Sequence, residues 1–554
     1  MTVKGGVIKT LPEIASKFLF TSSRCELPYQ LPLLISLLSG IKSQSIAETI
    51  FLTFYGRNFM NADYSEDKLV QENAAEILES LGWESFYAFD NEIFGEDENL
   101  SLGLQPDGKV FLGRSSKKQI LLVPYLKKAL ERFNPGITVD EIKKAVDVLL
   151  DYSLNNDLAM IVQQNKAFYT FIKDGIPVDT TDENGNNVRR TFKIINFNEK
   201  AEAPAEERNE FVAVRELWME SPIGKPLMRA DVIGFVNGIP LLFTELKRLD
   251  VDVRNAYLDN YKRSLDCVPH LFYYNAMVIL SNGMDAKIGT VGSKYKFFSE
   301  WSRKTEDDEV DDDEPKMHIM LEAVCCKQTF LDLVENFIIF DNSSGKLAKI
   351  LARNHQYLGV NQAFEKYKER QILEGKIGVF WHTQGSGKSY SMLFLAEKIH
   401  RKTGGNPTVV IITDRSELNK QISGTFEAAG CLGSVKASRY IASSGDDLAK
   451  KLSKENSKYI FTLIQKFNKS NPTPIHVDHD ILLISDEAHR TNNGIFAENM
   501  CALLPEASRL GFTGTPLFSS DNITKRTFGD YVSVYDFQRA VKDGATVPLY
   551  YCTA

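Results

Sequence analysis

The sequence has few cysteines and no long hydrophobic run. Its seven cysteines are scattered without a Cys-x-x-Cys pair, which argues against a zinc site of paired cysteines and favours reduced thiols. The apolar run Leu31–Leu38 is too short to cross a membrane, and no basic segment with a cleavage site marks a secretory leader. These absences predict a cytoplasmic protein without a membrane partner.

An excess of positive charge is also missing. The 65 Lys and Arg residues face 73 Asp and Glu, so the net charge of −8 supplies no overall basic field for nucleic acid. A local basic groove can still bind DNA in an acidic protein, so this argument against DNA binding is weak. The 554 residues suffice for three or four domains with sizeable cores.

A glycine-rich loop between a predicted strand and a predicted helix organises the second half of the chain. The apolar run Ile377–Trp381 precedes this loop, and the helical pattern Ser391–Ile399 follows it. Strand, glycine-rich loop and helix are the context that a phosphate-binding loop requires. The residues expected to bind ATP here are Thr383, Gln384, Gly385, Ser386, Gly387, Lys388 and Ser389.

Each part of this loop has an expected role. Gly385 and Gly387 allow backbone N–H groups to turn toward phosphate oxygens. Lys388 is expected to reach the β- and γ-phosphates, and the Ser389 hydroxyl is expected to bind Mg²⁺. The first glycine of the usual pattern is replaced by His382.

An acidic pair at the end of another apolar strand indicates what the loop is for. The strand-like run Ile481–Ser485 leads into Asp486 and Glu487, which are followed by Ala-His. Asp486 is predicted to hold the Mg²⁺ of ATP, and Glu487 is predicted to be catalytic by polarising the attacking water. The later segment Leu510–Pro516 has short hydroxyl residues between glycines, which suits a sensor of the nucleotide state.

These motifs resemble those of superfamily 2 helicase motors. Gly-Ser-Gly-Lys-Ser, Asp-Glu-Ala-His and Thr-Gly-Thr-Pro occur in the order of motifs I, II and III of such motors. The segment Arg353-Asn-His-Gln356 resembles their upstream glutamine motif, which implies that Arg353 and Gln356 help to bind ATP at its adenine. The resemblance implies a RecA-like parallel α/β lobe that uses ATP and Mg²⁺.

A predicted hairpin in the first half contains charged residues that suit a second catalytic site. Two apolar runs flank Asn237-Gly238, which is a strong hairpin signal, and Asp231 lies on the first run. Glu245 and Lys247 lie two residues apart on the second run, where a bare carboxylate is costly unless it is paired or bound to metal. Asp231 and Glu245 are therefore predicted to bind one Mg²⁺, and Lys247 to orient water or offset charge, for phosphodiester hydrolysis.

The spacing of this hairpin makes a geometric prediction. With a regular two-residue loop at Asn237-Gly238, Asp231 would stand opposite Thr244, and Glu245 would point to the other face of the sheet. One shared metal ion requires both carboxylates on the same face. We therefore predict either a three-residue loop with a left-handed Gly238 or a bulge in one strand.

The series Asp231, Glu245 and Lys247 resembles the core of PD-(D/E)xK nucleases. Its neighbourhood, including Asn209-Glu-Phe and the run from Phe235 to Leu241, resembles the restriction subunit, HsdR, of type I restriction-modification enzymes. The resemblance extends from about residue 65 to the end of the chain. Two departures are that Ala230 replaces the usual proline, and that the Gln-x-x-x-Tyr positions read Tyr257-x-x-x-Tyr261. The resemblance makes Tyr261 a candidate contact to the DNA backbone.

The resemblance implies an activity and partners. It implies a type I site-specific deoxyribonuclease that couples ATP-dependent DNA translocation to Mg²⁺-dependent endonucleolytic cleavage of double-stranded DNA. Its partners would be the methyltransferase and specificity subunits of the same system. The chain is expected to be cut after the first motor lobe and to be unable to translocate DNA alone. The alternatives are another helicase–nuclease fusion of DNA repair, or a catalytically silent fragment that binds DNA or partners.

The predicted fold class is α/β, with a PD-(D/E)xK-type mixed sheet and helices followed by a RecA-like parallel α/β helicase lobe. The predicted parts are an extension of unknown role (1–62), an endonuclease domain (63–303), an acidic loop and helical linker (304–345), the motor lobe (346–545) and the start of a second lobe (546–554). Residues 119–150 are expected to form two helices, the second capped by Thr138. Leu321–Phe340 is expected to be helical and the charge run Lys304–Pro315 to be a mobile loop.

Overall fold

The computed structural model describes most of the chain after residue 65. The described ranges are 66–95, 97, 100–154, 157–182, 184–309, 313–453, 457–469, 472–487, 494–515 and 522–546. The described residues form one compact unit. The predicted extension, residues 547–554 of the predicted start of a second lobe, Ala488, His489 and Pro516 lie outside the described residues. Within the described ranges, the search for a helix that could span a membrane finds none.

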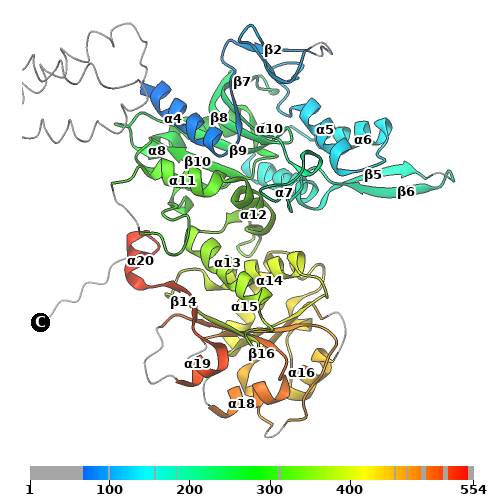
Figure 1. Ribbon diagram of the computed structural model, residues 1–554, viewed down its shortest axis with the longest axis vertical. Helices are drawn as coiled ribbons and strands as arrows, with labels where there is room; N and C mark the ends of the chain where they lie inside the picture. The colour runs from blue at the N-terminus through cyan, green and yellow to red at the C-terminus, as the bar shows by residue number, and fades with distance from the viewer. Residues whose placement is uncertain are drawn as a thin grey trace, which may run out of the picture. The chain divides into compact units, whose positions relative to one another are not determined.

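A six-stranded mixed sheet forms the centre of the first half (Figure 1). Its order is β1-β7-β8-β9-β10-β11, with β1 parallel to β7, β9 parallel to β10 and the other neighbours antiparallel. The strands are β1 (Glu84–Tyr87), β7 (Phe211–Met219), β8 (Met228–Val236), β9 (Ile239–Leu246), β10 (Met277–Ser281) and β11 (Ala286–Gly289). The residues of β9 are buried on both faces, which explains why its sequence is apolar almost throughout.

Helices and two small sheets surround this sheet. The helices are α4 (Glu66–Ser80), α5 (Val123–Phe133), α6 (Val139–Leu150), α7 (Leu158–Asp174), α8 (Val253–Asn255), the π-helical turn η2 (Ala256–Tyr261), α9 (Lys262–Cys267) and α10 (Pro269–Phe272), with short 3₁₀ turns at η1 (Ala205–Glu207) and η3 (Tyr295–Phe297). The small sheets are formed by β2 (Glu92–Ile93), β3 (Gly103–Leu104) and β4 (Val110–Phe111), and by the hairpin of β5 (Ile176–Thr181) and β6 (Asn187–Phe192).

The helices predicted for residues 119–150 are confirmed. The helix α6 begins directly after Thr138, whose hydroxyl accepts a hydrogen bond from the Glu141 N–H at 3.3 Å. The Glu141 carboxylate accepts one in return from the Thr138 N–H at 2.9 Å. This reciprocal cap satisfies two backbone donors that a helix start would otherwise leave unpaired.

The linker differs from its prediction at its end. Two helices, α11 (Lys316–Cys325) and α12 (Lys327–Asn336), are followed by β12 (Ile338–Asp341), which pairs with β13 (Ala348–Leu351). The expectation of helix through Phe340 is therefore wrong, because the β-branched and aromatic run from residue 337 favours a strand. At the start of the charge run, the Glu306 carboxylate accepts a hydrogen bond from Arg539 at 2.8 Å, and the mobility of the run stays a prediction.

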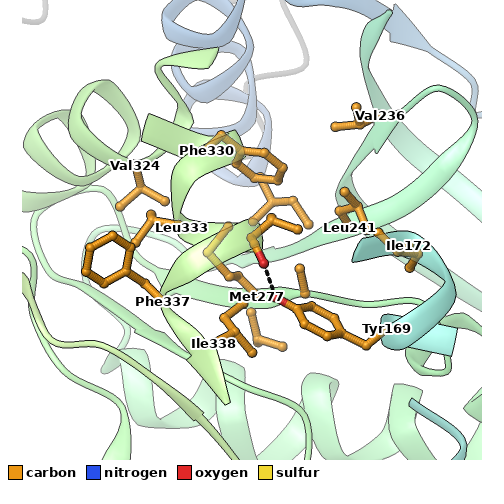
Figure 2. Packing of buried hydrophobic residues seen from close by; sticks show 14 of the residues in the cluster. Tyr169, Ile172, Val236, Leu241, Met277, Val324, Phe330, Leu333, Phe337 and Ile338 are labelled. Carbon is orange, nitrogen blue, oxygen red and sulfur yellow. Dashed lines mark hydrogen bonds between the residues drawn. The ribbon is translucent and has the colours of Figure 1, made fainter. Parts of the chain in front are cut away.

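One hydrophobic core joins the first sheet to the linker (Figure 2). The labelled side chains come from α7, β8, β9, β10, α11, α12 and β12, and are Tyr169, Ile172, Val236, Leu241, Met277, Val324, Phe330, Leu333, Phe337 and Ile338. The Tyr169 hydroxyl donates a hydrogen bond to the Val334 carbonyl within this core. The linker that leads to the second half therefore packs against the sheet of the first half and shares its hydrophobic core.

A six-stranded parallel sheet forms the second half (Figure 1). Its order is β16-β15-β17-β18-β14-β19. The strands are β14 (Lys376–His382), β15 (Thr408–Thr413), β16 (Tyr459–Leu463), β17 (Ile481–Asp486), β18 (Ser508–Thr513) and β19 (Tyr531–Tyr535). The helices are α13 (Asn354–Lys368), α14 (Lys388–Lys402), α15 (Ser416–Ala428), α16 (Gly445–Leu452), α18 (Gly494–Leu503), α19 (Asn522–Phe528) and α20 (Phe537–Lys542), with 3₁₀ turns η4 (Ala437–Arg439) and η5 (Ile464–Lys466). The predicted fold class, a mixed sheet followed by a parallel α/β lobe, is confirmed.

Two candidate active sites

The hairpin of β8 and β9 contains the predicted bulge. Val236 pairs with Ile239 across a two-residue turn, so the alternative of a three-residue loop is wrong. Further along, Phe235 pairs with Pro240 but Gly234 pairs with Leu242, which leaves Leu241 as an extra residue that faces no residue of β8. From this point the register shifts by one residue, and this shift sets the position of the two predicted carboxylates.

The shifted register places Asp231 opposite Glu245. Val232 pairs with Thr244, so the preceding residue of β8 faces the residue that follows Thr244 on β9. In antiparallel strands, residues that stand opposite each other project to the same face of the sheet. The bulge therefore brings both carboxylates to one face, as a shared metal ion would require.

The bulge is stabilised by its neighbours. The Leu241 carbonyl accepts hydrogen bonds from the Ala276 N–H at 2.7 Å and from the Asn275 side chain at 3.2 Å. The Leu241 side chain packs in the core that Figure 2 shows. Pro240 has no N–H to pair, so an irregular ladder at this point costs little. The carbonyl group of the extra residue, Leu241, therefore has hydrogen-bond donors although it lies in the bulge.

The turn itself restricts substitution at Gly238. Gly238 has a φ of 80°, and an added Cβ would lie 2.3 Å from the Leu122 carbonyl oxygen. Gly238→Ala is expected to lower the free energy of unfolding by about 3 kcal/mol or more, from the left-handed backbone and the clash together. The matched control is Gly185→Ala, because Gly185 has a φ of 82° and open space around it, and a loss of about 1 kcal/mol is expected there. Denaturant unfolding of both variants compares them, and equal losses would contradict the proposed clash.

The side chains of the first site form a buried network. Asp231 is 8% exposed, and its two oxygens accept hydrogen bonds from the Leu246 N–H at 2.7 Å and the Gln71 amide at 3.2 Å. Glu245 is 1% exposed and accepts a hydrogen bond from the Asn260 amide through Oε1. Its Oε2 is buried and receives no hydrogen bond from the residues that the structure describes. The Lys247 ammonium lies 3.6 Å from Glu245 Oε1.

Burial changes the acidity of both carboxyl groups. Burial raises the pKa of Asp231 to about 6, against the opposing effects of the Leu246 N–H and the Lys247 charge. Burial, and then repulsion by Asp231, raises the pKa of Glu245 well above its usual value. Two buried carboxylates that face each other fit a divalent cation, because a cation would satisfy the unpartnered Glu245 Oε2 and offset the repulsion.

The second site lies where three strands of the parallel sheet end. Strands β17, β18 and β14 are neighbours, and they end at Asp486, Thr513 and His382 respectively. A Cβ added to Gly514 would lie 3.2 Å from the Lys388 ammonium and 3.9 Å from a Glu487 carboxylate oxygen. The structure therefore brings the predicted phosphate loop, acidic pair and sensor segment together.

Burial and neighbouring charges shift the pKa values of the charged groups in this second site. Burial and then the neighbouring Glu487 raise the pKa of Asp486 to about 6. Burial lowers the pKa of Lys388, whose ammonium donates a hydrogen bond to the His382 carbonyl at 3.2 Å. Gly385 and Gly387 have φ values of 84° and 86°, as the turn of a phosphate-binding loop requires. Phosphate oxygens would give Lys388 the anionic partner that this geometry favours.

Side chains of helix α13 hold the phosphate loop through hydrogen bonds to its backbone. The Gln356 amide donates a hydrogen bond to the Gly387 carbonyl at 3.0 Å and accepts one from the Arg353 N–H at 2.9 Å. His355 Nε2 lies 2.9 Å from the Ser386 carbonyl oxygen. His382, the residue that replaces the usual glycine, lies 2.8 Å through Nε2 from the Ser533 hydroxyl on β19. Gln356 therefore holds the loop in place, and its contact to adenine stays a prediction, as does that of Arg353.

Two family models match the chain, one over each half. Residues 63–297 match the model of the type I restriction enzyme R protein N terminus, and residues 355–554 match that of SWI2/SNF2 ATPases. Over residues 63–297 the chain is therefore similar to the N-terminal part of type I restriction enzyme R proteins. The first match contains the network around Asp231 and Glu245, and the second contains the site around Lys388.

Proteins similar to the chain are named as type I restriction enzyme endonuclease subunits. The HindI endonuclease subunit of Haemophilus influenzae is 33% identical over 510 residues, which cover 87% of this chain and 45% of the relative. The putative MjaIXP endonuclease subunit of Methanocaldococcus jannaschii is 29% identical, covering 88% of this chain and 46% of the relative. The chain thus spans less than half the length of these two relatives. A fragment of a putative HsdR subunit from Vibrio vulnificus aligns at 15% identity and a TM-score of 0.26, over 58% of this chain and 52% of that one.

Three polar residues of the site around Asp231 and Glu245 were not predicted. Gln71 reaches Asp231 from α4, within an otherwise apolar stripe, and Asn260 reaches Glu245 from the π-helical turn η2. Glu216 lies on β7 across from Asp231, since its neighbours Arg215 and Leu217 pair with Val232 and Ala230. A buried charge within an apolar strand was the signal used for Glu245, and the same signal would have found Glu216.

Tyr261 does not occupy the position expected for a contact to DNA. Its side chain is 1% exposed and packs against Phe243 and Phe272. Its hydroxyl accepts a hydrogen bond from the Gly292 N–H at 3.1 Å. A ring enclosed in this way cannot touch a DNA backbone in this arrangement, so Tyr261 supports the turn that carries Asn260.

Protons and a metal ion should compete for the Asp231–Glu245 pair. The pKa of Asp231 is raised to about 6 and that of Glu245 is raised well above its usual value, so the pair binds protons at a higher pH than ordinary carboxylates do. The affinity for Mg²⁺ is expected to fall at least about tenfold between pH 7.5 and pH 5.5, with proton release on binding. Isothermal titration calorimetry in two buffers of different ionisation enthalpy measures both effects, with Glu245→Gln as the blank. An affinity that is independent of pH, without proton release, would contradict this reading.

Proposed function

We propose that this chain is the DNA-cleaving and ATP-binding part of a type I restriction subunit. In this proposal, Asp231, Glu245 and Lys247 cleave double-stranded DNA with Mg²⁺, and the second half binds the ATP that drives DNA translocation in the whole enzyme. The observation that supports it most strongly is the bulge at Leu241. It places two buried carboxylates opposite each other and beside a lysine, an arrangement that has no evident use in stability.

The residues of the first site have distinct roles in this proposal. Asp231 and Glu245 would hold the metal ion, which when bound polarises a phosphate oxygen and lowers the pKa of water. Gln71 and Asn260 fix the orientation of the two carboxylates through their amides. Lys247 lies at the partly exposed side of the pair, where it would orient the attacking water or offset charge on the phosphate.

The second site is proposed to bind ATP with Mg²⁺. Lys388 would contact the β- and γ-phosphates, and Ser389 and Asp486 would hold the metal ion of the nucleotide. Glu487 would polarise the water that attacks the γ-phosphate. The remaining loop residues Thr383, Gln384 and Ser386 would present backbone N–H groups to the phosphates. The match to an ATPase model over residues 355–554 supports these assignments.

The partners are proposed from the relatives. Those relatives are named as endonuclease subunits of type I restriction enzymes, so we propose that this chain assembles with methyltransferase and specificity subunits. These partners would select the target sequence, which leaves the present chain to supply cleavage and ATP binding.

Nicking of supercoiled plasmid DNA tests the proposed function. The chain is expected to nick the plasmid with Mg²⁺ but not with EDTA, and more efficiently when methyltransferase and specificity subunits and ATP are present. Cleavage that is unaffected by EDTA would refute a metal-dependent nuclease. A strict requirement for free DNA ends, without any effect of partner subunits, would instead support a DNA-repair nuclease.

A further inference from the structure

An aromatic and basic cluster lies beside the nuclease site. We define this aromatic–basic cluster as Tyr87, Phe89, Trp218, Lys117, Arg215 and Arg229. The rings of Tyr87 and Phe89 stack with their centroids 6.3 Å apart and their planes at 25°. The rings of Phe89 and Trp218 follow at 6.0 Å, so the three rings form a continuous row.

Each ring of the cluster has a cation close to its face. The Arg229 guanidinium lies 5.3 Å from the centre of the Phe89 ring and 5.6 Å from that of Trp218. The Arg215 guanidinium lies 5.5 Å from the Tyr87 ring, and the Lys117 ammonium lies 5.6 Å from the Trp218 ring. These distances are within the range of cation–π attraction.

The cluster is continuous with the catalytic face of the sheet. Trp218 on β7 stands opposite Arg229 on β8, so the two side chains project to the same face. Arg229 precedes Asp231 by two residues on β8 and therefore shares that face as well. A group bound by the cluster would lie next to the carboxylates that are proposed to hold the metal ion.

The cluster has charge and surface available for a ligand. Tyr87 is 38% exposed, and the Arg229 side chain is 39% exposed although it pairs with Glu216 at 2.6 Å. Within the part of the chain that the structure describes, Arg215 and Lys117 form no ion pair with a carboxylate. The Nε of Arg215 is buried there without a hydrogen-bond partner. Packing alone would leave these cations without a counter-ion, whereas an anionic ligand with a flat apolar part would satisfy cations and rings together.

We propose that the aromatic–basic cluster binds an unpaired base and the adjoining phosphates of the DNA strand that is cut. This inference rests on the proposed nuclease function and specifies the form of its substrate. In a duplex the faces of the bases are covered by their neighbours, so an aromatic side chain can stack only on a base that has left the stack. Stacking on aromatic rings, together with arginine contacts, is how proteins hold single strands without reading sequence. The nuclease site thus takes a strand that is locally unpaired beside the scissile phosphate.

Binding of short oligonucleotides to the full chain tests the proposal. The probes are a labelled single strand and an abasic strand of the same length, with Ca²⁺ in place of Mg²⁺ and the equilibrium followed by fluorescence anisotropy. The wild-type chain is expected to bind the strand with bases about tenfold more tightly than the abasic strand. Tyr87→Ala should reduce this preference to less than about threefold. Phe537→Ala is the matched control, because Phe537 is also 38% exposed but lies on α20 of the second half, and it should keep the preference.

The outcomes separate the cluster from the nuclease function. A preference for bases that survives in Tyr87→Ala would overturn the proposal, even if Asp231→Asn abolishes cleavage. Failure of the wild-type chain to distinguish the two strands would also overturn it and would make a protein partner the better occupant of this surface. A base preference that is lost only in Tyr87→Ala would support the cluster even if no Mg²⁺-dependent cleavage is found, in which case only the nuclease proposal fails.

Discussion

Asp231→Asn is expected to reduce Mg²⁺-dependent nicking of supercoiled DNA by about a thousandfold or more. The substitution keeps the shape of the side chain and its acceptor for the Leu246 N–H, but removes one of the two anionic oxygen donors that would hold the metal ion. The measurement is the initial rate of nicking over a range of Mg²⁺ concentrations. The matched control is Asp179→Asn on the exposed hairpin strand β5, which should cut at the wild-type rate.

Loss of folding can be separated from loss of catalysis in this variant. The pKa of Asp231 is higher in the folded chain than in the unfolded chain, because the folded chain buries the carboxyl group. Ionisation of Asp231 therefore destabilises the metal-free folded protein as the pH rises from about 4 through about 6. At pH 7.5 the metal-free Asp231→Asn variant should be at least as stable as the wild type. An inactive variant that is also much less stable would not support a role in metal binding, and nicking within tenfold of the wild-type rate would contradict that role.

Lys388→Ala is expected to weaken ATP binding by about a hundredfold, which corresponds to the loss of a charge-assisted contact to the phosphates. The Lys388 ammonium lies at the junction of the phosphate loop, Glu487 and the segment around Gly514. Equilibrium titration with a fluorescent ATP analogue in the presence of Mg²⁺ measures the affinity. Lys368→Ala, on the exposed side of α13, is the control and should bind normally. An affinity of Lys388→Ala within threefold of that of the wild type would exclude this loop as the nucleotide site.

In the second half, the strands and the residues that meet at their carboxyl ends were predictable from local sequence patterns. Its strands are short apolar runs that end in polar motifs, and parallel strands place their carboxyl ends at one edge of a sheet. That rule is enough to bring Lys388, Asp486 and Thr513 together without knowledge of the remaining packing. The role of α13 could not be predicted from the sequence, because the hydrogen bonds of Gln356 and His355 to the loop depend on the distance between the helix and the loop.

In the first half, the need for an irregularity between β8 and β9 was predictable, but its position and the polar partners of the carboxylates were not. The alternation of residues along β8 and β9 required an irregularity, but only the structure shows that it lies at Leu241, where Pro240 and the Asn275 side chain stabilise it. Gln71 lies 160 residues from its partner Asp231, so no local pattern connects the two. Asn260 faces Glu245 from a π-helical turn, which the sequence does not reveal because such a turn has no simple residue signature.

The most direct test of the proposed metal site is the anomalous difference map of a crystal of this chain grown or soaked with Mn²⁺. We expect one peak between Asp231 and Glu245, with an oxygen of each carboxylate within about 2.3 Å of the metal ion. The peak should disappear in crystals of Glu245→Gln. A map with no peak at this position, in crystals where Mn²⁺ is bound elsewhere on the chain, would contradict the claim that the bulge at Leu241 assembles a metal-dependent nuclease site.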